Sequence, residues 1–206
     1  MTDRTTFPGS TFWDERFQAD AYAYGTEPNH WLVSCAGAFA PCGRVLSLGE
    51  GEGRNAAWLA GRGFAVEAVD GSAAGLEKAR RLAAARGVSF ESRLANLAAW
   101  TPPAGAYDAV VLVYLHLPPA VRAAVHAGAA LALRSGGVLV LEAFAPAQLG
   151  RGSGPREAEL LYAADTLRGD FPGLAWEVLE DVEVDRDEGA FHRGRAAVVR
   201  GLGRRV

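Results

Sequence analysis

Three glycines at alternating positions, Gly49, Gly51 and Gly53, form the part of this chain best suited to chemistry. They follow the apolar run Arg44–Leu48 and precede a helix-like stretch, so the expected order is strand, loop and helix. Glycines keep side chains away, so backbone N–H groups and the helix N-terminus can approach a polar ligand closely. The loop therefore predicts a binding site for a nucleotide-like ligand.

The spacing of this glycine loop distinguishes between ligands. A dinucleotide fingerprint places its third glycine three residues after the second, but Arg54 occupies that position and the third glycine is Gly53. This form favours S-adenosylmethionine over a nicotinamide dinucleotide and makes an oxidoreductase the least favoured class.

An acid follows the loop at a distance suited to ribose binding. The run Phe64–Asp70 predicts a second strand that ends in Asp70, about twenty residues after the glycines. A carboxylate there could hold both hydroxyls of a ribose, with Gly71 beside it. The alternative is that Asp70 caps the helix that begins after Ser72. The glycine loop nearby favours the ligand interpretation.

Length and charge limit the possible classes of protein. With 206 residues, 50% of them hydrophobic, the chain is expected to form one domain. A net charge of −3 gives no basic field for phosphate backbones, so nucleic acid is not an expected partner. Cys35 and Cys42 have no companion ligands at metal spacing and predict free thiols in a reducing compartment. The chain begins without a signal peptide and has no membrane-spanning run, so a cytoplasmic protein is expected.

Strand-like and helical stretches alternate along the chain. The expected strands are Arg44–Leu48, Phe64–Asp70, Val88–Ser92, Tyr107–Tyr114 and Gly137–Phe144, with helical patterns between them. This alternation predicts an α/β fold with a Rossmann-like, doubly wound and mostly parallel sheet. Two β-branched runs, Val178–Asp187 and Phe191–Arg200, predict a C-terminal antiparallel hairpin that completes seven strands.

The segment before the first strand is rich in aromatic residues. They are Phe12, Trp13, Phe17, Tyr22, Tyr24 and Trp31. This is too many for a disordered tail, so residues 1–40 are expected to form a helical lid over a core of residues 41–206.

Four pieces of the sequence carry a resemblance to class I S-adenosylmethionine-dependent methyltransferases. They are Phe12–Phe17, Tyr24–Asn29, Gly49–Asn55 and Glu188–Arg193, and they are most similar to the tellurite-resistance and thiopurine methyltransferase group. The glycine loop is common to the superfamily, whereas Tyr-Gly-Thr-Glu-Pro and Gly-x-x-His-Arg are more restricted. The resemblance implies an S-adenosyl-L-methionine cofactor and methyl transfer to a small molecule.

The resemblance also implies roles for single residues. The loop glycines would approach the methionyl group, Asp70 would bind ribose, and Asn96 and Leu97 would lie beside adenine. The full set of expected cofactor contacts is Trp13, Tyr24, Gly49, Glu50, Gly51, Gly53, Asn55, Asp70, Gly71, Asn96, Leu97 and Val113. Two positions depart from the usual pattern, because Ser47 stands where an acid is common and Asn96 stands where Asp is common. An Asn carbonyl can still accept a hydrogen bond from the adenine amino group.

Glu50 and Glu52 add negative charge to the glycine loop. They would lie near the positions of a sulfonium and an amino group and could partly compensate for Ser47. The alternative is that both carboxylates are solvated.

Candidate acceptor residues lie on the hairpin and after the fourth and fifth strands. His192 and Arg193 match the Gly-x-x-His-Arg piece, so they are predicted to face the acceptor; the arginine would suit an anion, and the histidine would take a proton at pH 6–7. His116 is a third candidate, and Glu142 and Phe144 lie at the same sheet edge. The alternatives are a surface position for the hairpin pair and a structural hydrogen bond for His116. In-line transfer from a sulfonium chiefly requires alignment and desolvation.

The expected acceptor is soft, a thiol or a selenium or tellurium oxyanion, as the resemblance implies. The fourth strand is not followed by an Asn/Asp-Pro-Pro-Tyr motif, and no acidic metal cluster is evident, so no metal is expected. Two alternatives stay open: O- or N-methylation of a secondary metabolite, and a protein that holds the cofactor without turnover. The sequence does not indicate an oligomeric state.

Overall fold

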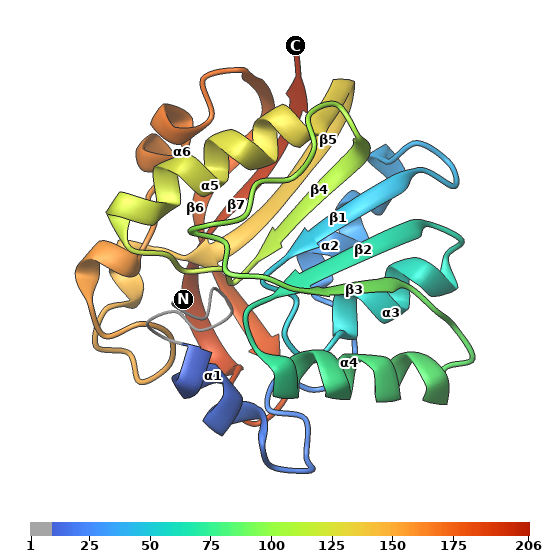
Figure 1. The fold of residues 1–206 in the computed structure, drawn as a ribbon. Helices are drawn as coiled ribbons and strands as arrows, with labels where there is room; N and C mark the ends of the chain where they lie inside the picture. Colours follow the sequence, from blue (N-terminus) through green and yellow to red (C-terminus); the bar gives the residue numbers. More distant parts are fainter. Residues whose placement is uncertain (1–9) are drawn as a thin grey trace, which may run out of the picture.

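The computed structural model describes residues 10–206 and is built on a seven-stranded sheet (Figure 1). The strand order is β3-β2-β1-β4-β5-β7-β6. The first five strands in this order are parallel, whereas β7 pairs antiparallel with β5 and β6. The strands are β1 Arg44–Leu48, β2 Ala65–Asp70, β3 Glu91–Leu94, β4 Tyr107–Val113, β5 Leu133–Phe144, β6 Leu174–Asp187 and β7 Arg193–Arg205. The predicted fold class is confirmed.

Helices cover both faces of the sheet. On one face, α5 and α6 pack through apolar residues such as Val125 and Leu167. On the other face, α2 and α3 pack through Leu32 and Leu59, and α4 lies beside α3. Strands covered on both faces need nearly continuous apolar runs, as in β4. The helices are α1 Ser10–Phe17, α2 His30–Cys35, α3 Arg54–Gly61, α4 Ala73–Ala85, α5 Pro119–Ala132 and α6 Ala164–Asp170.

Several predicted strands have different bounds in the structure; β5, for example, begins at Leu133 rather than at Gly137. The predicted strand Val88–Ser92 is replaced by β3, because the chain is still leaving α4 at Val88, whose N–H donates to the Ala83 carbonyl. The terminal hairpin is longer than predicted, since β7 also pairs with β5 as far as Arg204. However, β7 begins at Arg193 rather than at Phe191, so His192 lies in the turn between β6 and β7.

The glycine loop lies where the strand order changes direction, between β1 and β4. Ligands of open α/β sheets bind outside the carboxyl ends of the strands at such a point. β1 ends at Leu48, directly before the loop, and β4 ends at Val113. Tyr114 follows with a φ of 53°, a left-handed conformation that costs a bulky residue about 1–3 kcal/mol. The fold thus brings the loop and a strained tyrosine to one edge of the sheet.

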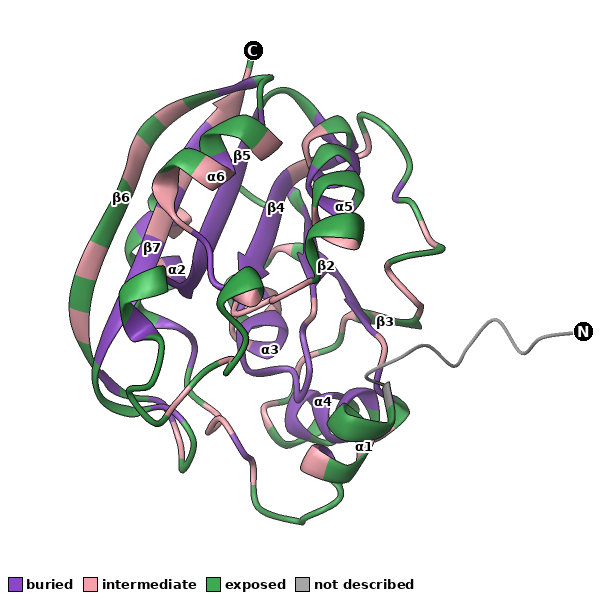
Figure 2. Ribbon diagram, turned by 90° about the vertical axis from the view of Figure 1, so that its left-hand side faces the viewer, coloured by how far each residue is buried: buried purple, intermediate pink, exposed green. Residues whose placement is uncertain are grey.

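The N-terminal segment divides into a cover and a part of the core. α1 lies against α4 (Figure 2). In contrast, α2 buries Leu32 and Cys35 in the core, and Trp31 Nε1 donates to the Gly201 carbonyl at 3.3 Å. The cover over the loop thus comes from α1 and the residues just after it, and residues 1–9 of the predicted lid lie outside the described residues. No helix in the described part of the chain is long and apolar enough to cross a membrane.

Candidate functional site

The backbone conformation of the loop favours glycine at positions 49, 51 and 53. Gly49, Gly51 and Gly53 have φ values of 68°, 60° and 87°, a region that side chains other than glycine rarely adopt. A Cβ on Gly53 would lie 2.5 Å from the Ala79 Cβ, and one on Gly49 would lie 2.8 Å from Leu115 Cδ1. The positive φ therefore favours glycine at all three positions, and at Gly53 the backbone of α4 also leaves no room for a Cβ.

Asp70 ends β2 and holds the glycine loop. Its Oδ2 accepts a hydrogen bond from the Gly51 N–H at 2.8 Å, and its Oδ1 accepts one from the Ser72 N–H at 2.7 Å. Burial raises the pKa of the Asp70 carboxyl, against these backbone hydrogen bonds. Ser72 is the residue that caps α4, because its Oγ accepts from the Gly75 N–H, so the helix-cap alternative for Asp70 is wrong. An ionised carboxylate has about four acceptor positions, which leaves Asp70 free to accept more hydrogen bonds.

Glu50 is buried and caps α3. Its Oε1 accepts from the N–H groups of Asn55 at 3.0 Å and Ala56 at 2.9 Å, and its Oε2 contacts the Ser47 hydroxyl. Burial raises the pKa of Glu50 to about 7, although these hydrogen bonds oppose the shift. The Glu50 carboxyl thus lies beside Ser47, the position at which the usual pattern has an acid.

Glu52 is also buried, and it ties the N-terminal segment to the loop. Its Oε2 accepts from the N–H groups of Ala23 at 2.9 Å and Tyr24 at 3.3 Å. Its other oxygen pairs with the Lys78 ammonium at 2.5 Å, and Lys78 also donates to two backbone carbonyls of the same segment. The alternative of solvated loop carboxylates is therefore wrong for both Glu50 and Glu52.

Aromatic side chains of the N-terminal segment cover the loop. Phe17 is so close that a Cβ on Gly51 would lie 3.2 Å from its Cζ. Trp13 stacks on Phe17 with ring centroids 5.6 Å apart, and Tyr24 meets Phe17 edge-on at 6.3 Å. In this structure the cover is closed over the loop.

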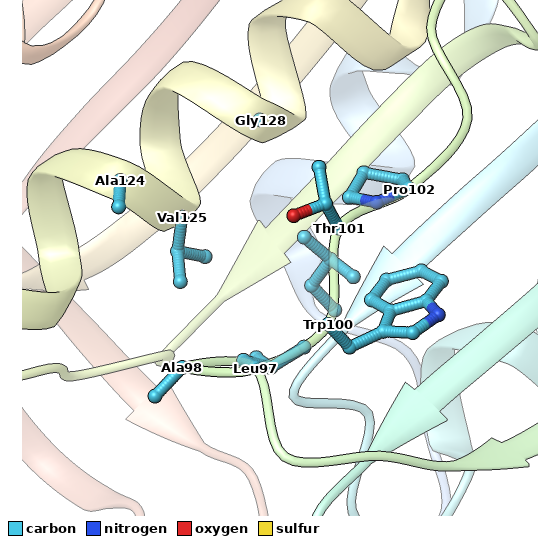
Figure 3. Close-up of a pocket in the computed structure, with 9 residues that line it drawn as sticks. Leu97, Ala98, Trp100, Thr101, Pro102, Ala124, Val125 and Gly128 are labelled. Carbon is cyan, nitrogen blue, oxygen red and sulfur yellow. The ribbon is translucent and has the colours of Figure 1, made fainter.

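The segment after β3 carries the residues predicted to lie beside adenine. Asn96 Oδ1 accepts from the Ala98 N–H at 2.9 Å and so closes a turn. Leu97, Leu48 and Val125 line a cavity of about 60 Å³ between this segment and α5 (Figure 3). Ligand pockets have volumes of about 300–1,000 Å³, so this cavity does not hold a nucleotide-sized ligand unless neighbouring parts move.

A buried polar cluster lies at the carboxyl edge of the sheet. Asn29 Nδ2 donates to Glu142 Oε1 at 2.7 Å and to Glu188 Oε1 at 3.0 Å. Glu188 Oε2 accepts from Arg54 Nη2 at 3.1 Å, and the Asn29 N–H donates to Asn55 Oδ1 at 2.9 Å. The cluster therefore joins the start of α2, the start of α3, the end of β5 and the hairpin turn.

His192 belongs to this cluster and lies among aromatic rings. Its ring centroid is 4.5 Å from that of Tyr24, 4.4 Å from that of Tyr114 and 5.4 Å from that of Phe144. Burial lowers the pKa of His192 to about 4, against the nearby Glu188 carboxylate. Burial alone would raise the pKa of Glu188, but the Arg54 guanidinium, 3.1 Å away, lowers that pKa to about 2. His192 is thus neutral near pH 7, and its titration lies below the pH 6–7 window expected from the sequence.

Four nitrogens of the cluster have no hydrogen-bond partner within residues 10–206. They are Arg54 Nη1, His192 Nδ1, and Nε and Nη1 of Arg186. His192 Nδ1 lies 3.5 Å from the nearest Glu188 oxygen, without hydrogen-bond geometry. All three side chains belong to residues that are more than nine-tenths buried. An unpaired buried donor costs about 1–3 kcal/mol, so a ligand or a water molecule that completed these hydrogen bonds would be stabilised here.

The other two predicted catalytic residues lie in different surroundings. The Arg193 side chain is 70% exposed and pairs with the exposed Asp187 at 3.1 Å. The His116 ring uses Nδ1 to donate to the Leu160 carbonyl at 2.7 Å and Nε2 to accept from the Phe144 N–H at 3.3 Å. Burial lowers the pKa of His116 to about 4. Arg193 and His116 therefore have the contacts expected of a surface residue and of a structural histidine.

Sequence reasoning missed several members of the cluster. Asn29 and Glu188 lie inside the pieces that carry the family resemblance, so their positions were a usable signal. Tyr114 directly follows the fourth strand, but nothing in the sequence indicates its positive φ. Arg186 follows two inward-facing valines at alternate positions of β6, so strand periodicity could have identified it as a buried arginine.

Residues 45–137 match the protein family described as methyltransferase domain. This span includes the glycine loop, Asp70, Asn96 and the strained Tyr114. No curated protein sequence matches the chain at a significant level.

Several solved structures are similar to this chain. One, described as "Conversion of a Disulfide Bond into a Thioacetal Group during Echinomycin Biosynthesis", has a TM-score of 0.74 at 23% identity and covers 95% of this chain and 92% of its own. TehB from Haemophilus influenzae has a TM-score of 0.71 at 15% identity, with 96% and 67% covered. The N-methyltransferase NodS from Bradyrhizobium japonicum WM9, in complex with S-adenosyl-L-homocysteine, has a TM-score of 0.71 at 14% identity, with 98% and 99% covered.

At these sequence identities the similar structures show only the fold. The activity is inferred from the match of residues 45–137 to the methyltransferase domain. The matched span holds the glycine loop and the acid at the end of β2, the two features that favoured S-adenosylmethionine in the sequence. The chain is therefore an S-adenosylmethionine-dependent methyltransferase.

Proposed function

We propose that this enzyme methylates a small, soft nucleophile, a thiol or a selenium or tellurium oxyanion, at the cluster around His192. The observation that carries the proposal is the set of unpartnered nitrogens of His192, Arg54 and Arg186 beside a wall of aromatic rings. The cluster is joined to the start of α3 through Asn55. A ligand there would lie beside the glycine loop, where a methyl acceptor is needed.

The residues proposed to hold the cofactor fit its chemistry. The three loop glycines present backbone without side chains, and Asp70 has acceptor positions left for ribose hydroxyls. S-Adenosylmethionine supplies, when bound, a methyl group on a sulfonium centre. The remaining proposed contacts are Trp13, Tyr24, Glu50, Asn55, Gly71, Asn96, Leu97 and Val113.

We propose that α1 moves when the cofactor binds at this loop. Phe17 packs on Gly51, and Trp13 packs on Phe17. The segment after α1 is anchored to the loop through Glu52 and Lys78. We therefore propose that α1 swings away while its C-terminal anchor stays in place, and that Trp13 and Tyr24 close again over the bound cofactor.

His192 is proposed to assist the acceptor. A neutral imidazole with an unpartnered ring nitrogen can accept a proton from a thiol as the new bond to the methyl carbon forms. The aromatic rings around it exclude water, and a neutral thiol is weakly hydrated and loses little by desolvation. The similar structure described for conversion of a disulfide into a thioacetal acts at sulfur, and this likeness supports a soft acceptor here.

An acceptor panel with methyl-labelled S-adenosylmethionine tests the proposal. The panel contains 2-mercaptoethanol, 3-mercaptopropionate, selenite, a catechol and a primary amine, and we expect label on sulfur or selenium. His192→Gln should lower turnover about 10²–10⁴-fold with unchanged affinity for S-adenosylhomocysteine.

His126→Gln is the matched control, because His126 is an equally buried histidine that bonds Asp170 in another part of the fold. This variant should keep its turnover. Label only on oxygen or nitrogen would instead support the secondary-metabolite alternative. No label on any acceptor would support a protein that holds the cofactor without turnover.

A further inference from the structure

Arg186 is a buried cation on β6 that the proposed proton transfer does not use. Its Nη2 donates to Ser153 Oγ at 2.9 Å. Its guanidinium carbon lies 4.8 Å from the Phe144 ring centroid and 6.0 Å from that of Tyr114. Its Nε and Nη1 have no partner in the described part of the chain. Packing and one hydrogen bond thus fix the side chain, while most of its donors stay free.

The charges of the cluster leave one cation without a carboxylate. Arg54 pairs with Glu188 at 3.1 Å, and Arg200 pairs with Glu142 at 2.7 Å. Arg186 is then left over, and it forms no ion pair within residues 10–206. Burying an ion without a counterion costs several kcal/mol, so an anion in this place would be stabilised.

Arg186 lies close to the position proposed for the acceptor. The Phe144 and Tyr114 rings that it contacts also contact His192. The charges of Arg54 and Arg186 both act on the His192 ring. A cavity of about 40 Å³ lies beside Arg186, but its lining also contains the acids Glu142, Asp185, Asp187 and Glu188 and does not contain His192. The Arg186 guanidinium and the His192 ring therefore lie against the same two aromatic side chains.

We propose that Arg186 binds a negatively charged group of the methyl acceptor, a carboxylate or an oxyanion, beside His192. The inference rests on the proposed function and narrows its substrate class to anions. Arginine suits this task because its planar donors match the oxygens of carboxylates and oxyanions. The cation–π contacts with Phe144 and Tyr114 hold the guanidinium in place without using its N–H groups.

Binding to the wild-type enzyme gives the first test and does not depend on turnover. The enzyme, saturated with S-adenosylhomocysteine, is titrated calorimetrically with 3-(methylthio)propionate and with its neutral analogue 3-(methylthio)propionamide. We expect the anion to bind at least tenfold more tightly than the amide. Selenite, added as a competitor, should displace the carboxylate if an inorganic oxyanion uses the same group. Equal affinities of the carboxylate and the amide would overturn the proposal.

Substitution of the arginine gives the second test. Arg186→Met should abolish the preference for the anion, a loss of about ten- to a hundredfold in its affinity, and Arg186→Lys should retain part of it. The matched control is Arg195→Met, which removes a 70% exposed arginine nearby on β7 and should change nothing. If Arg186→Met weakens S-adenosylhomocysteine binding equally, the arginine serves the cofactor and the proposal is wrong.

The two proposals can fail separately. Tight anion binding without label on any sulfur or selenium acceptor would leave the anion site standing and contradict the proposed reaction. Label on 2-mercaptoethanol and 3-mercaptopropionate at equal rates, with no effect of Arg186→Met, would support the reaction and contradict the anion site.

Discussion

The two ends of the sheet each bury a carboxylate cluster, but of these two clusters only the one at the carboxyl end leaves polar atoms unsatisfied within residues 10–206. At the amino end, Glu67 accepts hydrogen bonds from Tyr107 at 2.6 Å, from Arg93 at 2.8 Å and from Arg44 at 3.1 Å. Burial alone would raise the pKa of Glu67, but Tyr107 and Arg93 lower it below the ordinary value. None of these four residues has a buried polar side-chain atom without a partner in the described structure.

At the carboxyl end, the carboxylates Glu142 and Glu188 are also paired, yet nitrogens of Arg54, Arg186 and His192 are left over. Burial and charge are common to both ends, so neither of them identifies a site. The difference is completeness: the Glu67 cluster satisfies its own buried atoms, whereas the cluster around His192 keeps nitrogens that a ligand could complete. The strained φ of Tyr114 occurs at the same carboxyl end.

The largest expected difference in the free energy of unfolding is between two variants that each lack one arginine, one at each end of the sheet. Arg54→Met leaves Glu188, whose side chain is 5% exposed, without its cation, so the free energy of unfolding should fall by about 3–5 kcal/mol. Arg93→Met removes an arginine whose side chain is half exposed and should cost about 1 kcal/mol or less. Urea unfolding of both variants measures the contrast.

The double variant Arg54→Met/Glu188→Gln serves as the control for this pair. It removes the unpaired charge and should recover part of the lost stability. Equal losses of unfolding free energy in Arg54→Met and Arg93→Met would show that the buried ion pair of Arg54 is no more important for stability than the half-exposed ion pair of Arg93.

The second prediction compares how Glu50, at the carboxyl end, and Glu67, at the amino end, make the free energy of unfolding depend on pH. Glu50 titrates near pH 7 in the folded protein and near 4.5 in the unfolded chain, so folding binds a proton between these values and stability falls as pH rises. Glu50→Gln should therefore gain about 3 kcal/mol relative to wild type between pH 4.5 and 8. Glu67 has a lowered pKa, so its contribution is present above pH 4.5 and is lost on acidification.

Urea unfolding between pH 4 and 8 separates these cases. The difference between Glu67→Gln and wild type should stay constant from pH 5 to 8. A constant difference for Glu50→Gln over the same range would mean that Glu50 stays ionised in the folded protein.

The third prediction concerns the acid that holds the loop. Asp70→Ala should weaken S-adenosylmethionine binding by about 1.5–3 kcal/mol, the range for hydrogen bonds to a charged group. Ser72→Ala removes the cap of α4. It should reduce the free energy of unfolding by about 1 kcal/mol and so lower the melting temperature, without a comparable loss of affinity. Calorimetric titration and thermal unfolding of both variants distinguish binding from capping. An equal effect of both on affinity would argue against a ribose contact.

The smallest expected effect is a change in hydrogen exchange on the cover of the carboxyl end. Adding S-adenosylhomocysteine should slow amide exchange in residues 10–24, which lie over the loop and are anchored through Glu52. Exchange in α2 and near Glu67 should not change, because α2 packs in the core and Glu67 lies at the opposite end. Unchanged exchange in residues 10–24 would assign their aromatic rings to static packing.

Local pattern was enough to predict much of this protein. The run Arg44–Leu48, the glycine spacing and the acid at Asp70 have local causes, namely strand burial, positive φ and the end of a strand, so the sequence predicts them directly. The same holds for the parallel sheet and the terminal hairpin. The bounds of β3 were missed because an edge strand that is mostly exposed has little apolar pattern to mark it.

The sequence by itself determined the sheet, the glycine loop and the methyl-transfer chemistry that the loop serves. Only the tertiary structure decided which charged side chains find partners, because those partners lie far apart in the chain, as in the pairs Asn29 with Glu188 and Arg54 with Glu188. It separated His192, which is buried beside unpartnered donors, from Arg193, which is adjacent in sequence but exposed on the surface. Hydrogen-bond satisfaction depends on distances between elements, and no local pattern of residues records those distances.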